Sequence, residues 1–380
     1  MPLIQRIVDF HADMKAWRQD IHTHPELAFR EYRTSELVSR TLAGFGIEVH
    51  RGLAGTGVVG TLRAGRGRRA IGLRADMDAL PIRGIMHACG HDGHTAMLLG
   101  AARYLAETKH FDGVVHFIFQ PAEENECGGQ RMVEDGLFEQ FPVEAVYGMH
   151  NWPGLPVGEF GVCVGPIMAA DDKFEITLTG RGAHAAMPHL GDDPIVAAAA
   201  LVGGIQTIVS RNVDPQDGAV VSITHIQGGN TWNIVPEQVV LRGTCRYLRP
   251  GLRTVLRDAI RRVSDGVAAA YGVTSGISHY KPIPPAVNAE APTEQAIRAA
   301  AAVVGEAHVR RDVVPSMGCE DFAFMLAARP GCYVWIGNGP IVDGVGLHSS
   351  RYAFNDDILP IGASYWATLV ETSTSDTCRY

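Results

Sequence analysis

The segment from Gly84 to Met97, GIMHACGHDGHTAM, concentrates side chains that bind transition metals. Within eight positions it carries His87, Cys89, His91, Asp92 and His94. Thiolate and imidazole together suit zinc or another late first-row ion. In an extended segment, Cys89 and His91 would point to the same side, because they are two residues apart. We therefore expect them to share a metal site, although a chance cluster of loop histidines would give the same local pattern.

A closed structural zinc site is not expected. Such sites use four Cys or His ligands, commonly in paired CxxC and HxxxH motifs, and the sequence has no CxxC to complete such a set. The pair Glu123 and Glu124, which follows the apolar run FIFQP, favours catalysis instead. Adjacent carboxylates at a strand end point in different directions, so one can bind a metal while its neighbour accepts a proton from water. An exposed acidic loop is the alternative, but the apolar run before the pair argues against it.

Four short apolar runs, separated by helical patterns, predict the strands that position these residues. They cover residues 70–78, 113–124, 144–151 and 332–339, and apolar spacing predicts a helix over 94–108. The fold class is therefore α/β, with a mostly parallel sheet flanked by helices. Ligands of such sheets lie beyond the carboxyl ends of the strands. Polar residues gather at those ends: Asp76 and Asp78, Glu123 and Glu124, and His150.

The middle of the chain predicts a different unit. From Met168 the order is strand, helix, two strands, helix, strand, which is that of a ferredoxin-like α+β unit. Its first helix is expected to open at Asp193 with Pro194 in the first turn. We place this insert at residues 168–281, inside a domain formed by residues 1–167 and 282–380. A further helix over 291–307 is expected to have a capping signal at Thr293.

Composition excludes several classes of protein. The chain has 380 residues, enough for two domains, and its net charge of −8 argues against a nucleic-acid binder. No apolar run approaches the roughly 18 residues that span a bilayer, and the charged start of the sequence lacks a secretion signal. We therefore expect a cytoplasmic protein without a membrane partner. Seven scattered cysteines do not indicate a disulfide framework.

Eight ordered motifs resemble the amidohydrolase branch of the M20 metallopeptidases. They are RADMDALPI, MHACGHDGHTAMLLGAA, QPAEE, GMHN, GRGAHAAMPH, GGNTWNIVP, EDFA and LHSSRYAFND. The resemblance implies a zinc-peptidase-like catalytic domain that carries two divalent metal ions, with zinc, manganese, nickel and cobalt all open. It implies as metal ligands Cys89, His91, Glu124, His150 and His348.

The resemblance also implies roles for the remaining site residues. Glu123 would be the general base, and Asp76 and Asp78 would orient ligands by hydrogen bonds. His184 would reach the active site across a dimer interface and stabilise the oxyanion. Asn233 and Arg246 match positions that contact the substrate, although an exposed strand arginine is an equal alternative for the latter. The inserted domain would act as a lid and hold a homodimer together.

These observations predict a metal-dependent enzyme that cleaves the amide of N-acyl or N-aroyl amino acids, such as hippurate. Within the enzyme class, a dipeptidase or carboxypeptidase is the main alternative. A metal-binding protein without turnover is a second alternative, but it would have no need of Glu123 as a base. A redox role for Cys89 is a third.

Overall fold

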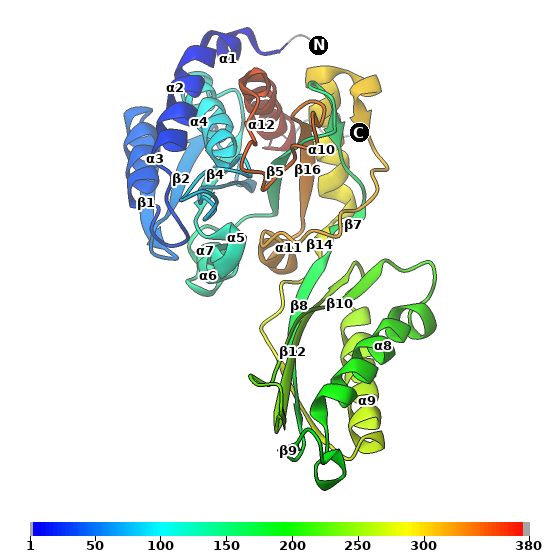
Figure 1. Cartoon of the computed structure of the whole chain (residues 1–380). Helices are drawn as coiled ribbons and strands as arrows, with labels where there is room; N and C mark the ends of the chain where they lie inside the picture. Colours follow the sequence, from blue (N-terminus) through cyan, green and yellow to red (C-terminus); the bar gives the residue numbers. More distant parts are fainter. Residues whose placement is uncertain (1–2, 375–380) are drawn as a thin grey trace. The chain divides into compact units, whose positions relative to one another are not determined.

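The computed structural model describes residues 3–374, apart from the side chain at position 125, and this part of the chain divides into two compact units (Figure 1). Within the described residues, unit 1 comprises 3–167, 286–314 and 321–374. Unit 2 comprises residues 168–285 and 315–320. The expected insert, 168–281, therefore lacks residues 282–285 and 315–320 of this unit. The first of these segments bonds to unit 2 through Ile283 N and Asp171 O, and the second through Ala169 N, which donates to Ser316 O and Gly318 O.

Unit 1 is built on an eight-stranded sheet in the order β1-β2-β4-β3-β5-β16-β6-β15. The strands are β1 Glu48–Leu53, β2 Gly57–Ala64, β3 Ala70–Asp76, β4 Gly113–Gln120, β5 Ala145–Trp152, β6 Phe160–Gly161, β15 Val309–Arg310 and β16 Gly331–Gly337. The neighbouring strands β4, β3, β5 and β16 run parallel to one another. They are buried along nearly their whole length, as expected for apolar strands covered on both faces. The predicted α/β class is confirmed.

Helices cover this sheet and build one continuous core with it (Figure 1). The main ones are α1 Gln5–Asp9, α2 His11–Thr23, α3 Tyr32–Gly44, α4 His91–Thr108, α10 Glu290–Val304 and α12 Leu359–Thr374. Their buried side chains, such as Leu98 and Leu369, share a cluster with Phe117 and Tyr147 of the sheet. This packing holds the carboxyl ends of the parallel strands in fixed relation to the start of α4.

Shorter elements complete unit 1. They are α5 Glu123–Glu126, α6 Gly128–Glu134, α7 Leu137–Gln140, α11 Ala323–Ala328, and the paired strands β7 Gly165–Met168 and β14 Ala286–Asn288. The predicted cap at Thr293 is wrong. Helix α10 already begins at Glu290, and the Thr293 hydroxyl donates to Ala289 O within the first turn.

Unit 2 has its own four-stranded antiparallel sheet in the order β10-β12-β8-β13. Its elements are β8 Ala170–Thr179, β9 Ala183–His184, α8 Pro194–Asn212, β10 Ala219–Gly228, β11 Ile234–Val235, β12 Gln238–Tyr247, α9 Leu252–Ala270 and β13 Thr274–His279. If the four strands of this sheet are numbered along the chain, β8, β10, β12 and β13 become strands 1 to 4. Their order across the sheet is then 2-3-1-4, which, with two helices, is that of a ferredoxin-like fold. As predicted, Asp193 caps α8, accepting from Ile195 N at 2.8 Å, and Pro194 occupies the first turn.

Helix α8 meets the length and apolarity of a membrane span, contrary to the expectation that no segment comes close. One of its faces is occupied in the unit 2 core, where Ala197, Leu201 and Ile205 pack with residues of α9 and the sheet. The core helix of a folded domain passes the same test by composition, so the finding is weak support for a membrane span.

Candidate metal centre and active site

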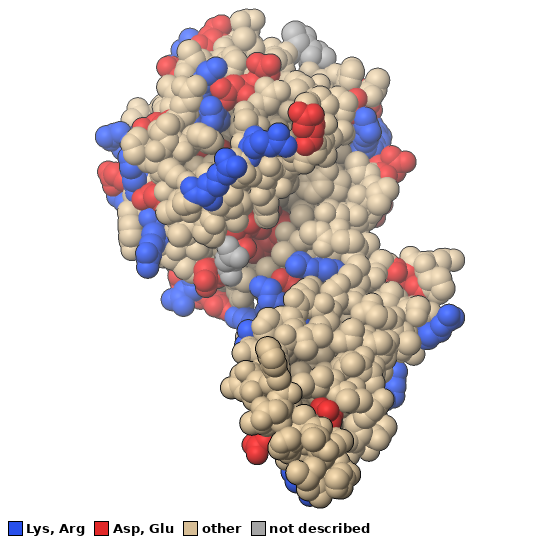
Figure 2. All heavy atoms as spheres, in the orientation of Figure 1, with Lys and Arg blue, Asp and Glu red and all other residues tan. Residues whose placement is uncertain are grey.

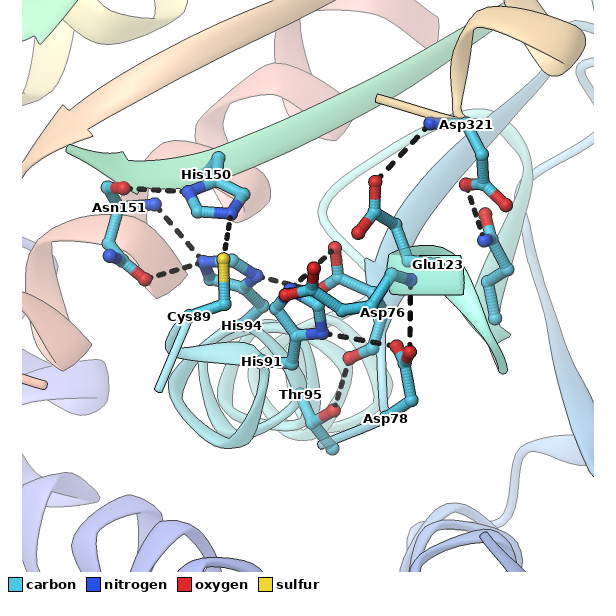
Figure 3. A network of polar contacts seen from close by, with 12 residues as sticks. Asp76, Asp78, Cys89, His91, His94, Thr95, Glu123, His150, Asn151 and Asp321 are labelled. Carbon is cyan, nitrogen blue, oxygen red and sulfur yellow. Dashed lines mark hydrogen bonds and ion pairs between the residues drawn. The ribbon is translucent and has the colours of Figure 1, made fainter. Parts of the chain in front are cut away.

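The predicted site residues of unit 1 converge at the carboxyl ends of its parallel strands (Figure 3). Asp76 ends β3, Glu123 opens α5 just after β4, and His150 lies near the end of β5. The loop before α4 supplies Cys89, and His348 comes from a loop after β16. Segments far apart in the sequence are therefore brought together by strand order alone, as the rule for open α/β sheets requires.

The five predicted metal ligands form one cluster. Cys89 Sγ lies 3.4 Å from His150 Nε2 and 3.4 Å from His348 Nε2. Glu124 Oε1 lies 3.3 Å from His348 Nε2 and 3.8 Å from His91 Nε2. Two overlapping trios, Cys89 with His91 and His150 and Cys89 with Glu124 and His348, each have ligand atoms within 4.8 Å of one another. Cys89 belongs to both trios, which is the position that a ligand shared by two ions would occupy.

A helix start, and not an extended segment, places Cys89 beside His91. His91 is the first residue of α4, and Gly90 before it has φ of 97°. A side chain here would be strained by this φ, and its Cβ would come within 1.9 Å of Asn151 Oδ1. The expected extended geometry is therefore wrong, although the two side chains still reach the same cluster.

The chemistry of the donors fits divalent cations. His91 Nε2 is a buried atom without a hydrogen-bond partner among the described residues, and it lies 3.8 Å from Glu124 Oε1. Burial, together with the nearby Glu124 and Glu123 carboxylates, raises the pKa of the Cys89 thiol well above its usual value. A buried thiol among carboxylates is stable as a thiolate only if cations offset the negative charge. The residues present therefore suit a pair of metal ions.

Asp76 and Asp78 contact the rings of His91 and His94 through their carboxylates. Asp78 Oδ1 lies 3.1 Å from His91 Nδ1, and Asp78 Oδ2 accepts from Glu124 N at 3.1 Å. Asp76 Oδ1 lies 2.6 Å from His94 Nδ1 and its Oδ2 lies 3.7 Å from His91 Nε2. Burial alone would lower the pKa of His91, but these carboxylates overcome burial and raise it to about 10. The direction of that shift shows that the surrounding carboxylates favour a positive charge at His91.

His94 is a residue that the sequence analysis did not assign. Besides Asp76, its ring contacts Asn151, with Nε2 at 2.8 Å from Asn151 Oδ1. Its ligand atom also falls within 4.8 Å of ligand atoms of Asp76 and His91, so this is a third trio that could hold a cation. Its place one helical turn after His91 was a signal for a shared face. His87, in contrast, is buried outside the cluster, and burial lowers its pKa to about 4.

Glu123 lies beside the cluster, held by a different segment. Its Oε1 accepts from Asp321 N at 3.3 Å (Figure 3). Its carboxylate also lies within 4.8 Å of the ligand atoms of His91 and Glu124. The Glu123 side chain is half-buried, so it can meet a small substrate. The adjacent glutamates therefore diverge: Glu124 points at His348, and Glu123 toward the main chain of Asp321.

Arg74 links Asp76 with Asp321 through its guanidinium, and the sequence did not reveal this role. It is 1% exposed, and it donates to Asp76 at 2.8 Å, Gln120 at 2.9 Å and Asp321 at 3.1 Å. Asp321 in turn accepts from Gly129 N at 2.8 Å. A lone arginine in the apolar run AIGLRAD must have buried acidic partners, which was the signal available in the sequence.

The candidate residues of unit 2 lie on its surface. His184 is exposed on β9, where its Nδ1 accepts from Ala186 N at 3.1 Å. Asn233 is exposed in the loop before β11, with its Oδ1 accepting from Thr231. Arg246 on β12 is a quarter exposed and pairs with Asp171 at 3.5 Å.

A surface cavity lies beside Asp78 in unit 1. Its volume is about 670 Å³, and it is lined by Leu27, Phe29, Arg30, Asp78, Pro81 and Glu126. Cavities of this size accommodate small molecules.

Figure 2 shows where lysine, arginine, aspartate and glutamate side chains lie on one face of the molecule.

Comparison with known proteins gives consistent results. Residues 72–372 match the model of the peptidase family M20/M25/M40. The chain is 39% identical to a hippurate hydrolase from Campylobacter jejuni, covering 97% of this chain and 98% of that protein. It is 34% identical to thermostable carboxypeptidase 1 from Saccharolobus solfataricus, over 97% and 98% of the two chains. The crystal structure of the Bacillus subtilis YxeP protein, described as a dinuclear metal binding peptidase, matches with a TM-score of 0.84, 34% identity, and coverage of 96% and 99%.

Proposed function

Because the chain belongs to the peptidase family M20/M25/M40, we propose that it is a binuclear metal-dependent amidohydrolase acting on N-acyl or N-aroyl amino acids. The products would be a carboxylic acid and a free amino acid. The observation that carries the proposal is the clustering of Cys89, His91, Glu124, His150 and His348, with Glu123 beside them. Similarity to a hippurate hydrolase along nearly the whole chain supports the substrate class.

Two divalent ions would be held by the five clustered residues, with the Cys89 thiolate shared between them. When bound, such ions polarise the amide carbonyl and lower the pKa of water to about 7. Asp78 fixes the His91 ring through Nδ1, which leaves Nε2 available as the ligand atom. Zinc, manganese, nickel and cobalt all remain compatible with this mixture of thiolate, imidazole and carboxylate.

Glu123 would act as the general base. Its carboxylate lies next to the ligand cluster and would accept the proton of the attacking water, then deliver it to the leaving amine. The Asp321 N–H donates to Glu123 Oε1 at 3.3 Å, which orients the carboxylate beside the ligand cluster. A protein that only stored or sensed metal would need the ligands but no such base.

Unit 2 would supply the remaining contacts and the dimer interface. We propose that His184 donates to the developing oxyanion of the partner's site, and that Asn233 and Arg246 contact the substrate carbonyl and carboxylate. Exposed apolar side chains on unit 2 support an interface there, and they include Ile195, Val196, Ile226, Trp232 and Ile234. Strand β10 is also an edge of its sheet, a position at which strands from two copies pair. Unit 2 would further act as a lid that excludes water from the reaction.

We propose a cytoplasmic location, with neither nucleic acid nor membrane among the partners. The negative net charge supports the first exclusion. The burial of one face of α8 in the unit 2 core supports the exclusion of a membrane.

The alternative activity is that of a carboxypeptidase or dipeptidase. Similarity to the Saccharolobus carboxypeptidase favours it, and the same metal cluster and base would serve it. A panel of N-acetyl, N-benzoyl and dipeptide substrates distinguishes the two activities. The panel should be run on chelated enzyme restored with each candidate metal. The amidohydrolase proposal requires the N-acyl and N-benzoyl amino acids to be the better substrates by kcat/KM.

The decisive variant is Glu123→Gln. We expect a fall in kcat of at least about 100-fold, with two metal ions per chain retained, because the amide cannot accept a proton. Metal content is measured by plasma mass spectrometry on the same sample. Glu139→Gln, at an exposed glutamate of the nearby helix α7, is the matched control and should behave as wild type. Full activity in Glu123→Gln would disprove its assignment as the base.

A further inference from the structure

We propose that Glu31, in the N-terminal part of unit 1, is a positioning residue for the Glu123–Glu124 turn. The inference rests on the proposed function, because it assigns Glu31 a role in the same reaction. Glu31 lies outside the motifs that carry the family resemblance. It does not belong to the metal cluster. It acts by holding the main chain immediately before the base.

The contact is a direct hydrogen bond to that main chain. Glu31 Oε1 accepts from Ala122 N at 2.9 Å and from Phe29 N at 3.1 Å. Its other oxygen, Oε2, accepts from the Thr56 hydroxyl at 2.6 Å. The Glu31 side chain is fully buried, so water cannot replace these bonds. Both carboxylate oxygens are therefore committed to fixing neighbouring segments.

The turn that Glu31 holds is short and conformationally strained. Ala122 has φ of 56° and Cys127 has φ of 54°, so non-glycine residues in the left-handed region flank the single turn of α5. Each costs about 1 kcal/mol or more and persists only where its surroundings enforce it. The Ala122 N–H is fixed by Glu31, and Ala122 O accepts from Gly128 N at 2.9 Å. Without the first bond, the left-handed residue that aims Glu123 loses its main external constraint.

The main chain of Glu31 is itself held in place by helix α3. It precedes α3, and its carbonyl accepts from Ser35 N at 2.8 Å in the first turn of that helix. Helix α3 packs on the core through Val38 and Leu42. A helix anchored in the core thus fixes one side of the turn, while Asp78 fixes Glu124 N and Asp321 N fixes the Glu123 carboxylate. The base and the adjacent ligand are held from three independent segments.

Three substitutions separate positioning from simple stability. Glu31→Ala removes the acceptor for Ala122 N and should lower kcat about 10- to 100-fold, with KM changed less than threefold, because small displacements of reacting groups cost factors of this size. Glu31→Gln retains an acceptor oxygen and should restore wild-type kcat. Thr56→Val removes a bond to the same carboxylate but leaves Ala122 held, so it should lose stability without losing kcat. If Glu31→Ala fails to fold, Glu31→Asp is used in its place. Its side chain is one methylene shorter, so its carboxylate no longer reaches Ala122 N.

A second measurement does not depend on turnover. The absorption spectrum of the cobalt-loaded protein reports the geometry of the ligands, which include Glu124. We expect the spectrum to change in Glu31→Ala and to match wild type in Glu31→Gln and Thr56→Val. If Glu31→Ala and Thr56→Val lose stability alike while kcat and the spectrum stay unchanged, Glu31 is only structural and the proposal is wrong. Failure of the wild type on every N-acyl substrate, with the spectral pattern intact, would instead overturn the proposed function and leave the positioning role standing.

Discussion

The candidate site residues of the two units lie in different environments. In unit 1 the candidate site is a buried network, in which Arg74, Asp76 and His94 are almost inaccessible and linked by hydrogen bonds shorter than 3 Å. In unit 2 the candidate residues His184 and Asn233 are exposed, with local contacts to residues two positions away. The apolar core of unit 2, built on Phe174, Leu201 and Leu256, lies elsewhere in that unit.

The two sets of candidate residues differ in how far the fold alone fixes their positions before a substrate binds. Buried charges persist only when neighbours compensate them, so the geometry of the unit 1 site is fixed by the same contacts that stabilise the fold. The exposed residues of unit 2 gain a defined position only from an additional partner, which we propose to be substrate and a second copy of the chain. Substitutions in the first region should therefore alter stability, and those in the second should alter activity alone.

The largest effect on stability should come from Arg74→Met. This change leaves Asp76 and Asp321 as buried carboxylates without their shared cation, which costs about 3–5 kcal/mol in the free energy of unfolding. The matched change in unit 2 is Arg257→Met. Arg257 also pairs with a buried aspartate, Asp172, at 2.8 Å, but it is 27% exposed and Arg253 remains nearby.

We therefore expect Arg257→Met to cost only about 1 kcal/mol. Both variants can be measured by urea denaturation of the metal-free protein. If both variants lose the same free energy of unfolding, the buried Arg74 network contributes no more to stability than the Arg257–Asp172 pair does. Adding Asp321→Asn to Arg74→Met should recover part of the stability, because it removes one of the uncompensated charges.

A pH-dependent effect should follow from Glu31. Burial raises the pKa of this carboxyl to about 7, compared with 4.5 for an ordinary glutamate. A raised pKa in the folded state favours the protonated form, so its contribution to stability is complete below pH 4.5 and is lost as pH rises to about 7. Glu31→Gln mimics the protonated form at every pH.

The variant and wild type should therefore be equally stable near pH 4.5, and the variant should be more stable by about 3 kcal/mol at pH 8. Thermal or urea unfolding across that range measures the difference. If the difference does not depend on pH, Glu31 titrates as an ordinary carboxylate. An advantage of the variant at low pH only would reverse the sign and contradict the account.

The smallest effect on stability, but a clear effect on rate, is expected for His184→Ala. An exposed side chain contributes within about 0.5 kcal/mol to folding, whereas loss of an oxyanion donor lowers kcat about 100-fold. His189→Ala, at another exposed histidine of unit 2, is the control and should leave kcat unchanged. Mixing His184→Ala with Glu123→Gln tests the contact between copies. Hybrid dimers should regain part of the activity, and no recovery would mean that His184 does not act across an interface.

The sequence predicted the elements of both units well, because apolar periodicity and strand ends are local signals. The four buried strands, the fold class and the helix–strand order of unit 2 follow from such patterns. The errors occur where a single residue or a tertiary contact sets the geometry. Gly90 starts α4 at His91, three residues earlier than helical spacing suggested, and Thr293 lies inside a helix that begins at Glu290.

The same distinction explains what could be predicted of the site. The proposed ligands lie in sequence motifs, so residue type and order pointed to them. His94, Arg74 and Glu31 were missed because their importance comes from partners distant in sequence, such as Asn151, Asp321 and Ala122. Arg74 carried a usable signal as a charge in an apolar strand. Glu31 carried none, since its role depends on tertiary contacts such as the hydrogen bond from Ala122 N.

The most direct test of the account is an anomalous difference map from crystals of the protein loaded with zinc or manganese. The account predicts two adjacent peaks bounded by Cys89, His91, Glu124, His150 and His348, with the Glu123 carboxylate next to them and not ligated. A single peak between Asp76, His91 and His94, or ligation by Glu123 itself, would contradict it.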